Sequence, residues 1–175
     1  MFRLITIISV ALTVGVVMMM GKKLAVPAGV VQKKGRYPLL EGLVALAMWV
    51  SLIVLVCTGF CGASLLGHSL KGFMTLIHVS FGTLFAISIA VLAVFRGEAY
   101  CFGAGETSGR FSIAQKVCFW IIALCGLVLI LSILTSMLRL FGTDGQLLSA
   151  WVHRFSALIA LLAAIVYAGA ARARG

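Results

Sequence analysis

The chain has 175 residues, of which 63% are hydrophobic and only 10% are charged, and its mean hydropathy is +1.21. A soluble domain could not bury this much apolar surface, so the composition predicts an integral membrane protein, and the length predicts that residues 1–175 form a single transmembrane domain. The formal net charge of +10 is interpreted as a topology signal with attraction to anionic lipid, and nucleic-acid binding is not expected.

Five apolar runs are each long enough to cross a hydrocarbon core of roughly 30 Å, which takes about 20 helical residues. None contains an internal Pro or Asp, and none shows the sustained period-two alternation of a membrane β-barrel. The predicted fold class is therefore all-α, a membrane bundle of about five transmembrane helices. In chain order, the predicted spans are residues 4–20, 43–66, 73–95, 117–138 and 147–168.

The first run, which follows Arg3, has the character of either a spanning helix or a secretory signal. The Ala-Val-Pro-Ala segment after Lys22 and Lys23 is a poor cleavage site, so we interpret residues 4–20 as an uncleaved span. A cleaved segment or an interfacial helix is the alternative.

The distribution of basic residues predicts the orientation of the chain. If the spans alternate, one side of the membrane holds ten Lys and Arg residues and the other holds four. Because basic residues concentrate in cytoplasmic loops, the side with ten is predicted to be cytoplasmic. The N-terminus is then outside, the C-terminus is cytoplasmic, and the turns near Lys71 and Asp144 are on the outer face.

A weak internal repeat follows the first span. Residues 56–82 can be laid over residues 133–157, with Thr58 opposite Thr135, and each copy predicts a helical hairpin whose second helix carries a His near its outer end. These residues are His78 and His153. Because the two helices run in the same direction, the two imidazoles are predicted at similar depth.

An imidazole within a membrane helix needs a polar partner or a metal. Haem iron takes two axial imidazoles, so His78 and His153 are candidate haem ligands, and hydrogen bonds to neighbouring Ser, Thr or carbonyl groups are the alternative. Gly82 and Ala157 follow the two histidines by four residues, on the same helical faces, and would leave room for the macrocycle.

Three further residues are predicted at the outer end. Lys71 and Arg154 could pair with haem propionates, or they could extend to lipid head groups without a specific ligand. His68 could be a ligand of a second haem completed by another chain, a hydrogen-bond donor to quinone, or a hydrated interfacial residue.

Two segments, Gly67-His68 through His78-x-x-x-Gly82 and Trp151-Val152-His153-Arg154-Phe155-Ser156-Ala157, resemble the b-type membrane cytochromes of bacterial respiratory complexes, namely the cytochrome b561-like and formate dehydrogenase gamma-like subunits. The resemblance covers residues 43–168. It implies that such histidines ligate haem b, and that the subunit passes electrons between a peripheral redox subunit and membrane quinone. It also implies a bacterial cytoplasmic (inner) membrane location and an outer-face iron-sulfur or multihaem cytochrome partner. Since the chain has three His in all, a second bis-His haem would need a ligand from a partner chain.

The four acidic residues are predicted in loops or at the ends of spans, so neither an autonomous proton pump nor a hydrolase is expected. We interpret the chain as a non-catalytic electron-transfer subunit of an oxidoreductase complex. A haem-free anchor or assembly subunit is the first alternative, and a small transporter is the second.

Overall fold

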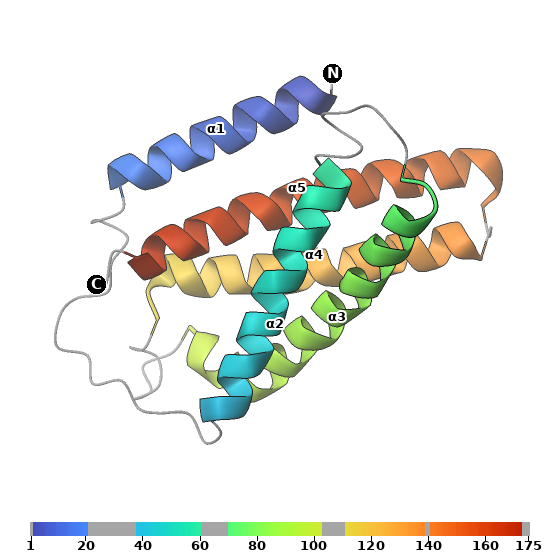
Figure 1. Ribbon diagram of the computed structural model, residues 1–175. Helices are drawn as coiled ribbons and strands as arrows, with labels where there is room; N and C mark the ends of the chain where they lie inside the picture. Colours follow the sequence, from blue (N-terminus) through green and yellow to red (C-terminus); the bar gives the residue numbers. More distant parts are fainter. Residues whose placement is uncertain (1, 21–37, 61–69, 103–110, 139–140, 173–175) are drawn as a thin grey trace, which may run out of the picture. The chain divides into compact units, whose positions relative to one another are not determined.

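The computed structural model describes residues 2–20, 38–60, 70–102, 111–138 and 141–172, and these ranges are almost wholly helical (Figure 1). Their elements are α1 (Phe2–Met20), α2 (Pro38–Val56), α3 (Phe73–Arg96), the 3-10 turn η3 (Gly97–Tyr100), α4 (Ile113–Met137) and α5 (Gly142–Arg172). All five α-helices are long and apolar enough to cross a membrane. The predicted all-α fold and the multi-pass membrane character are therefore confirmed.

The helices begin where local chemistry favours a start. Ser112 caps α4 by accepting the backbone N–H of Gln115 at 3.2 Å, and the Gln115 side chain accepts the Ser112 N–H at 3.1 Å, which is a reciprocal capping box. In both hairpins a glycine with positive φ stands where the second helix begins. Gly72 has φ 57° before α3 and Gly142 has φ 62° at the start of α5, a conformation that side-chain-bearing residues rarely adopt.

Several helices extend beyond the predicted spans. Glu41, Lys116 and Asp144 lie just before the predicted spans, which begin at residues 43, 117 and 147, and the structure places each of them in the first turn of a helix, namely α2, α4 and α5. The reason is physical: hydropathy marks only the residues in hydrocarbon, whereas a helix continues through the head-group region, where polar side chains are tolerated. The α2 helix ends in a π-helical turn over residues 57–60, and the remainder of its predicted span, residues 61–66, lies outside the described residues.

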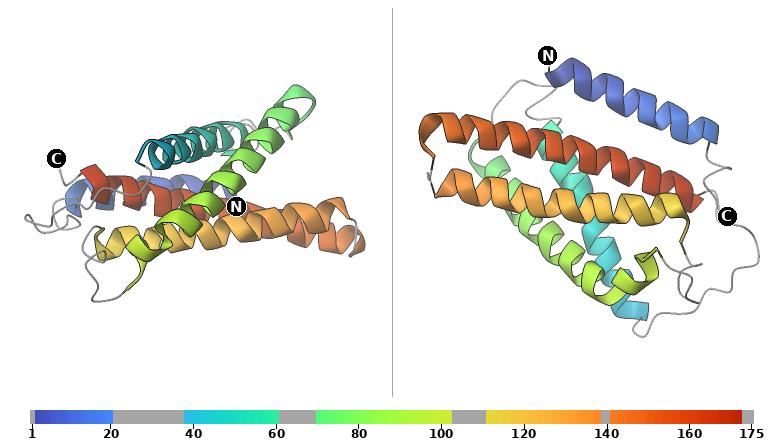
Figure 2. Two further views of the ribbon diagram at one scale, coloured as in Figure 1. Left: turned by 90° about the horizontal axis from the view of Figure 1, so that it is seen from below. Right: turned by 180° about the vertical axis from the view of Figure 1, so that it is seen from behind.

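The chain divides into two compact units. One comprises Met1–Ile8 and Gln32–Gly97, and the other comprises Ser9–Val31 and Glu98–Gly175. In the first unit α2 and α3 pack as an antiparallel hairpin, and in the second α4 and α5 do the same (Figure 2). The expectation of one domain over residues 1–175 stays a prediction.

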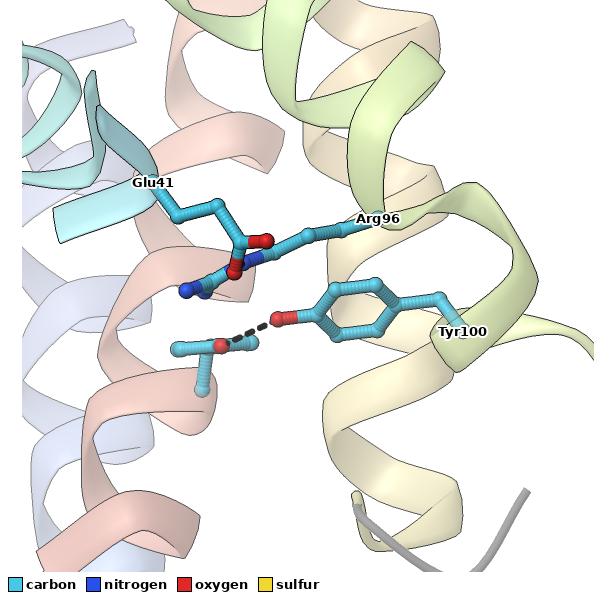
Figure 3. A network of polar contacts seen from close by, with 4 residues as sticks. Glu41, Arg96 and Tyr100 are labelled. Carbon is cyan, nitrogen blue, oxygen red and sulfur yellow. Dashed lines mark hydrogen bonds and ion pairs between the residues drawn. The ribbon is translucent and has the colours of Figure 1, made fainter. Parts of the chain in front are cut away.

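In the first unit, an ion pair closes the hairpin at the end away from its turn. Arg96 Nε donates to Glu41 Oε2 at 2.8 Å (Figure 3), and the two side chains are 18% and 9% exposed. Glu41 is in the first turn of α2 and Arg96 is in the last turn of α3. Each charge therefore also interacts favourably with the dipole of its own helix.

In the second unit, the corresponding end is built from aromatic rings around buried Tyr100. This ring is stacked between Phe111 and Phe119, with centroids 4.2 and 3.9 Å away, and its hydroxyl lies 2.6 Å from that of Tyr167. Lys116 Nζ donates to the Cys101 carbonyl at 2.7 Å. The described ends of the connection between α3 and α4 are therefore well packed, although its Gly-rich sequence predicts a flexible connector.

Candidate functional site

His78 lies on the second turn of α3, where its imidazole meets the end of α2. Its Nδ1 atom is 2.8 Å from Thr58 Oγ1, and the ring is half-buried. Thr58 belongs to the π-helical turn that ends α2, a type of irregularity that is frequent at functional sites.

The hydrogen bonds of Thr58 indicate which ring nitrogen of His78 carries the proton. Thr58 Oγ1 lies 2.8 Å from the Val54 carbonyl oxygen, which can only accept, so the single hydroxyl proton points to that carbonyl. The hydroxyl oxygen must then accept from His78 Nδ1–H, because the opposite arrangement would set two oxygen lone pairs against each other. In the neutral ring this places the lone pair on Nε2.

Gly59 is packed against the same ring. A Cβ atom built on Gly59 would lie 3.2 Å from His78 Cε1 and 3.9 Å from His78 Nδ1, and the first distance is tighter than an ordinary van der Waals contact. The absence of a side chain at position 59 therefore lets the imidazole approach Thr58. Nothing in the sequence indicated this role for Gly59, and Thr58 was indicated only through the repeat alignment.

His153, on the fourth turn of α5, repeats this arrangement in the second unit. Its Nδ1 atom is 3.0 Å from Ser132 Oγ, and Ser132 Oγ donates to the Leu129 carbonyl at 2.7 Å. By the same reasoning, Ser132 accepts from His153 Nδ1–H, and the neutral ring has its lone pair on Nε2. Ser132 is buried on α4, whereas His153 is half-buried.

The two hydroxyl–imidazole pairs have nearly equal spacing in sequence. Thr58 and His78 are 20 residues apart, and Ser132 and His153 are 21 apart. The repeat alignment placed Thr58 opposite Thr135, but the structural counterpart of Thr58 is Ser132, one helical turn earlier. Thr135 instead lies 3.0 Å from Ser149 Oγ.

The small residues predicted to flank the histidines are both half-buried. A Cβ at Gly82 would meet only Leu55, at the ordinary contact distance of 3.9 Å, so packing against α2 does not require glycine there. Ala157 lies one turn after His153, as predicted.

The predicted basic residues, Lys71 and Arg154, are exposed, Lys71 just before α3 and Arg154 on α5. His68 lies outside the described residues.

His78 belongs to the first compact unit and His153 to the second. Within the described ranges, no group of three or more His, Cys, Asp or Glu residues could hold a metal ion.

Comparison of the sequence with protein-family models and with curated proteins, and of the fold with solved structures, gives no match.

Proposed function

We propose that this protein is a haem b-binding membrane subunit of a respiratory electron-transfer complex, with His78 and His153 as the axial ligands of one haem. Electrons would pass between a redox subunit on the outer face of a bacterial cytoplasmic membrane and quinone in the lipid. The chain would be one subunit of an oxidoreductase and not a complete enzyme.

One observation carries the proposal: in each hairpin the imidazole Nδ1 lies within hydrogen-bond distance of a hydroxyl that itself donates to a backbone carbonyl. Thr58 accepts from His78 Nδ1–H and Ser132 accepts from His153 Nδ1–H, so each neutral ring has its lone pair on Nε2. Iron binds an imidazole through a ring nitrogen lone pair, and ligating histidines usually donate their other ring N–H to a nearby acceptor. The donor set of the two hairpins therefore fits haem ligation.

The surrounding residues have supporting roles in this proposal. Thr58 and Ser132 orient the rings and increase their electron donation, and Gly59 gives the His78 ring its place against α2. Gly82 and Ala157 would leave space beside the rings, and the exposed cations Lys71 and Arg154 are available to propionates. When bound, haem supplies a reversible one-electron carrier whose potential depends on its axial ligands and their hydrogen bonds. The proposal requires the two units to bring the two imidazoles to one iron.

The test is the haem content of the full chain, purified in detergent after expression with a haem supply. We expect a Soret band, a sharp α-band on reduction and a pyridine haemochrome typical of haem b. His78→Ala and His153→Ala should each lose the low-spin spectrum, whereas His68→Ala, a change outside the proposed ligand pair, should keep it. Normal spectra in both ligand variants would reject the assignment.

A haem-free anchor or assembly subunit is the second candidate. The same hydrogen bonds favour it in a different way, because each imidazole already has a polar partner within its own hairpin and is thus tolerated in a membrane helix without iron. In that case the purified wild-type chain would contain no haem, and His78→Ala and His153→Ala would affect only stability.

A further inference from the structure

The α5 helix carries a positive charge well inside the segment that is apolar enough to cross a membrane. This segment is Gly142–Ala171, and Arg154 is the only Lys or Arg within it. Its polar first turn ends before Leu147, so Arg154 lies seven residues into the apolar part, roughly 10 Å along the helix axis. The Arg154 side chain is exposed, which is costly at this depth, and ionisable residues within membrane helices usually have a partner.

Arg154 is exposed on one face of α5, next to two aromatic side chains. Buried Ser156 follows it by two residues, about 200° around the helix, and is therefore almost on the opposite face. Trp151 and Phe155, which lie beside Arg154, are 46% and 41% exposed, and their rings are stacked with centroids 5.7 Å apart. One turn further along, Leu158 is buried, so the exposed face is limited to the turns around Arg154. Trp and Arg are among the residue types that contribute most to binding at protein interfaces.

The first unit has no free carboxylate to compensate this charge. The chain has four acidic residues, and Glu41 is the only one in the first unit. Its carboxylate is already bonded to Arg96, at 2.8 Å. The two arginines therefore differ. Arg96, in the last turn of α3, has a carboxylate partner, whereas Arg154, well inside α5, forms no ion pair with the described residues.

In the second unit, the acidic residues of the described ranges lie towards the two ends of α5. Asp144 is on α5 itself, ten residues before Arg154 and roughly 15 Å from it. Glu98 belongs to η3, which contacts α5 at Tyr167, thirteen residues or roughly 20 Å beyond Arg154. Glu106 lies outside the described residues. A second copy of the chain in the same orientation would have its acidic residues at the same depths, so it would not supply a carboxylate beside Arg154.

We propose that this face of α5, formed by Trp151, Arg154 and Phe155, is an interface for a transmembrane helix of another polypeptide, and that this helix carries an Asp or Glu at the depth of Arg154. A carboxylate offers the guanidinium two acceptor oxygens and neutralises its charge, and polar contacts of this kind strengthen the association of helices in lipid. The interface does not require haem, so it is compatible with a cytochrome subunit and with a haem-free anchor.

The experiment measures binding of the full chain to a synthetic transmembrane peptide of Leu and Ala in phosphatidylcholine nanodiscs. The peptide has one Asp at the depth of Arg154 and a fluorescence acceptor that quenches the emission of Trp151 on approach, and a second peptide has Asn in place of Asp. We expect the Asp peptide to bind about tenfold more tightly than the Asn peptide, a factor that corresponds to ~1.4 kcal/mol.

Three variants test whether this preference comes from Arg154. Arg154→Met should abolish the preference for the Asp peptide, and Arg154→Lys, which keeps the charge, should retain most of it. Lys71→Met, which removes an exposed cation outside α5, is the matched control and should retain it fully. Equal binding of the two peptides by the wild type, or an unchanged preference in Arg154→Met, would overturn the proposal. Loss of the preference on addition of phosphatidylglycerol would also overturn it, because Arg154 would then bind a lipid phosphate.

Two measurements without peptide separate this interface from a partner within the chain or a cofactor. Arg154→Met should leave the midpoint of unfolding by sodium dodecyl sulfate unchanged or raise it, because it removes an unpaired cation from an apolar segment. A lower midpoint would show that the partner of Arg154 lies within this chain, Glu106 included, and would overturn the proposal. The haem content should be unchanged, and its loss in Arg154→Met would instead assign the cation to a propionate.

The interface and the proposed function fail on different results. Absence of haem from the wild-type chain would reject the cytochrome proposal alone, and absence of a preference for the Asp peptide would reject the interface alone.

Discussion

Each of the two hairpins has a histidine in a membrane helix, and in each the imidazole is hydrogen-bonded to a hydroxyl of the other helix, but the surroundings of the two histidines differ. In α2 and α3, the His78 ring lies against Gly59 in a π-helical turn, and the far end is closed by the ion pair between Glu41 and Arg96. In α4 and α5, the partner of the imidazole is Ser132 in regular helix, and the far end is closed by aromatic rings around Tyr100.

The hydroxyl–imidazole hydrogen bond is common to both hairpins, while the packing around it is specific to each hairpin. If a function depends on the histidines, matched substitutions in the two hairpins should therefore impair it to a similar extent. If a function depends on the surrounding packing, a substitution should impair it in one hairpin only.

The largest expected effect of packing is at Gly59, which only the first hairpin has. Gly59→Val would place side-chain atoms where the His78 ring lies, so the ring would be displaced from Thr58. We expect haem occupancy to fall at least about tenfold, since a loss of ~1.4 kcal/mol already gives that factor. Gly42→Val is the matched control in the same helix, because a Cβ there meets nothing within 4 Å. Full occupancy in Gly59→Val would contradict this account of the His78 site.

The next prediction concerns the ends of the two hairpins opposite their turns, where an ion pair holds one and aromatic residues hold the other. Glu41→Gln keeps a hydrogen-bond acceptor but removes the charge that compensates Arg96. We expect the free energy of unfolding to fall by roughly 1–2 kcal/mol, a value between those of exposed and fully buried ion pairs. Tyr167→Phe removes one neutral hydrogen bond of the aromatic end and should cost about 0.5–1.5 kcal/mol. Unfolding by sodium dodecyl sulfate in mixed micelles measures both. A larger loss for Tyr167→Phe would reverse the ranking proposed for the two ends.

A third prediction concerns the hydroxyl that accepts the imidazole N–H in each hairpin, Thr58 in the first and Ser132 in the second. Thr58→Val and Ser132→Ala remove the acceptor of Nδ1–H, which lowers the electron donation of each imidazole and destabilises ferric iron. The midpoint potential of the haem should rise in both variants, by ~40 mV if about 1 kcal/mol is lost in a one-electron couple. Thr58→Ser should restore the wild-type potential. Thr83→Val, which removes a hydroxyl bonded only within its own helix among the contacts described, should leave the potential unchanged.

The smallest effect is expected at Ser51, which contrasts with Ser132. Both serines are buried, but the Ser51 Oγ atom has no hydrogen-bond partner in the described part of the chain, whereas Ser132 has two. Ser51→Ala removes an unpaired polar atom and should be neutral or stabilising by up to about 1 kcal/mol. Ser132→Ala should instead destabilise. The same detergent titration checks the sign, and a clear loss of stability in Ser51→Ala would show that its hydroxyl has a partner.

Hydropathy alone predicted the helices well because the hydrocarbon thickness sets their length. The boundaries were less accurate, as Lys116 shows. The predicted span began at residue 117, but Lys116 is in the first turn of α4 and its long side chain reaches the Cys101 carbonyl. Helix ends depend on caps such as Ser112 and on tertiary partners, and hydropathy does not report either.

The histidines were predictable because an imidazole in an apolar run is rare and requires a partner. The hydrogen-bond partners of the histidines were not predictable from the sequence. Hydroxyl residues are common in membrane helices, and the register of the hairpin decides which hydroxyl faces a given histidine. Thr135 was the expected counterpart of Thr58, yet one turn of difference assigns that role to Ser132. The role of Gly59 depends on a close approach that appears only once the two helices are packed.

We propose that the imidazoles of His78 and His153, one from each hairpin, bind one haem through their Nε2 atoms. The most direct measurement is electron paramagnetic resonance of the oxidised full chain, combined with the haem-to-protein ratio. The account predicts one haem per chain with a low-spin ferric signal of bis-imidazole ligation, lost in both His78→Ala and His153→Ala. Absence of haem, or a low-spin signal that survives either substitution, would contradict it.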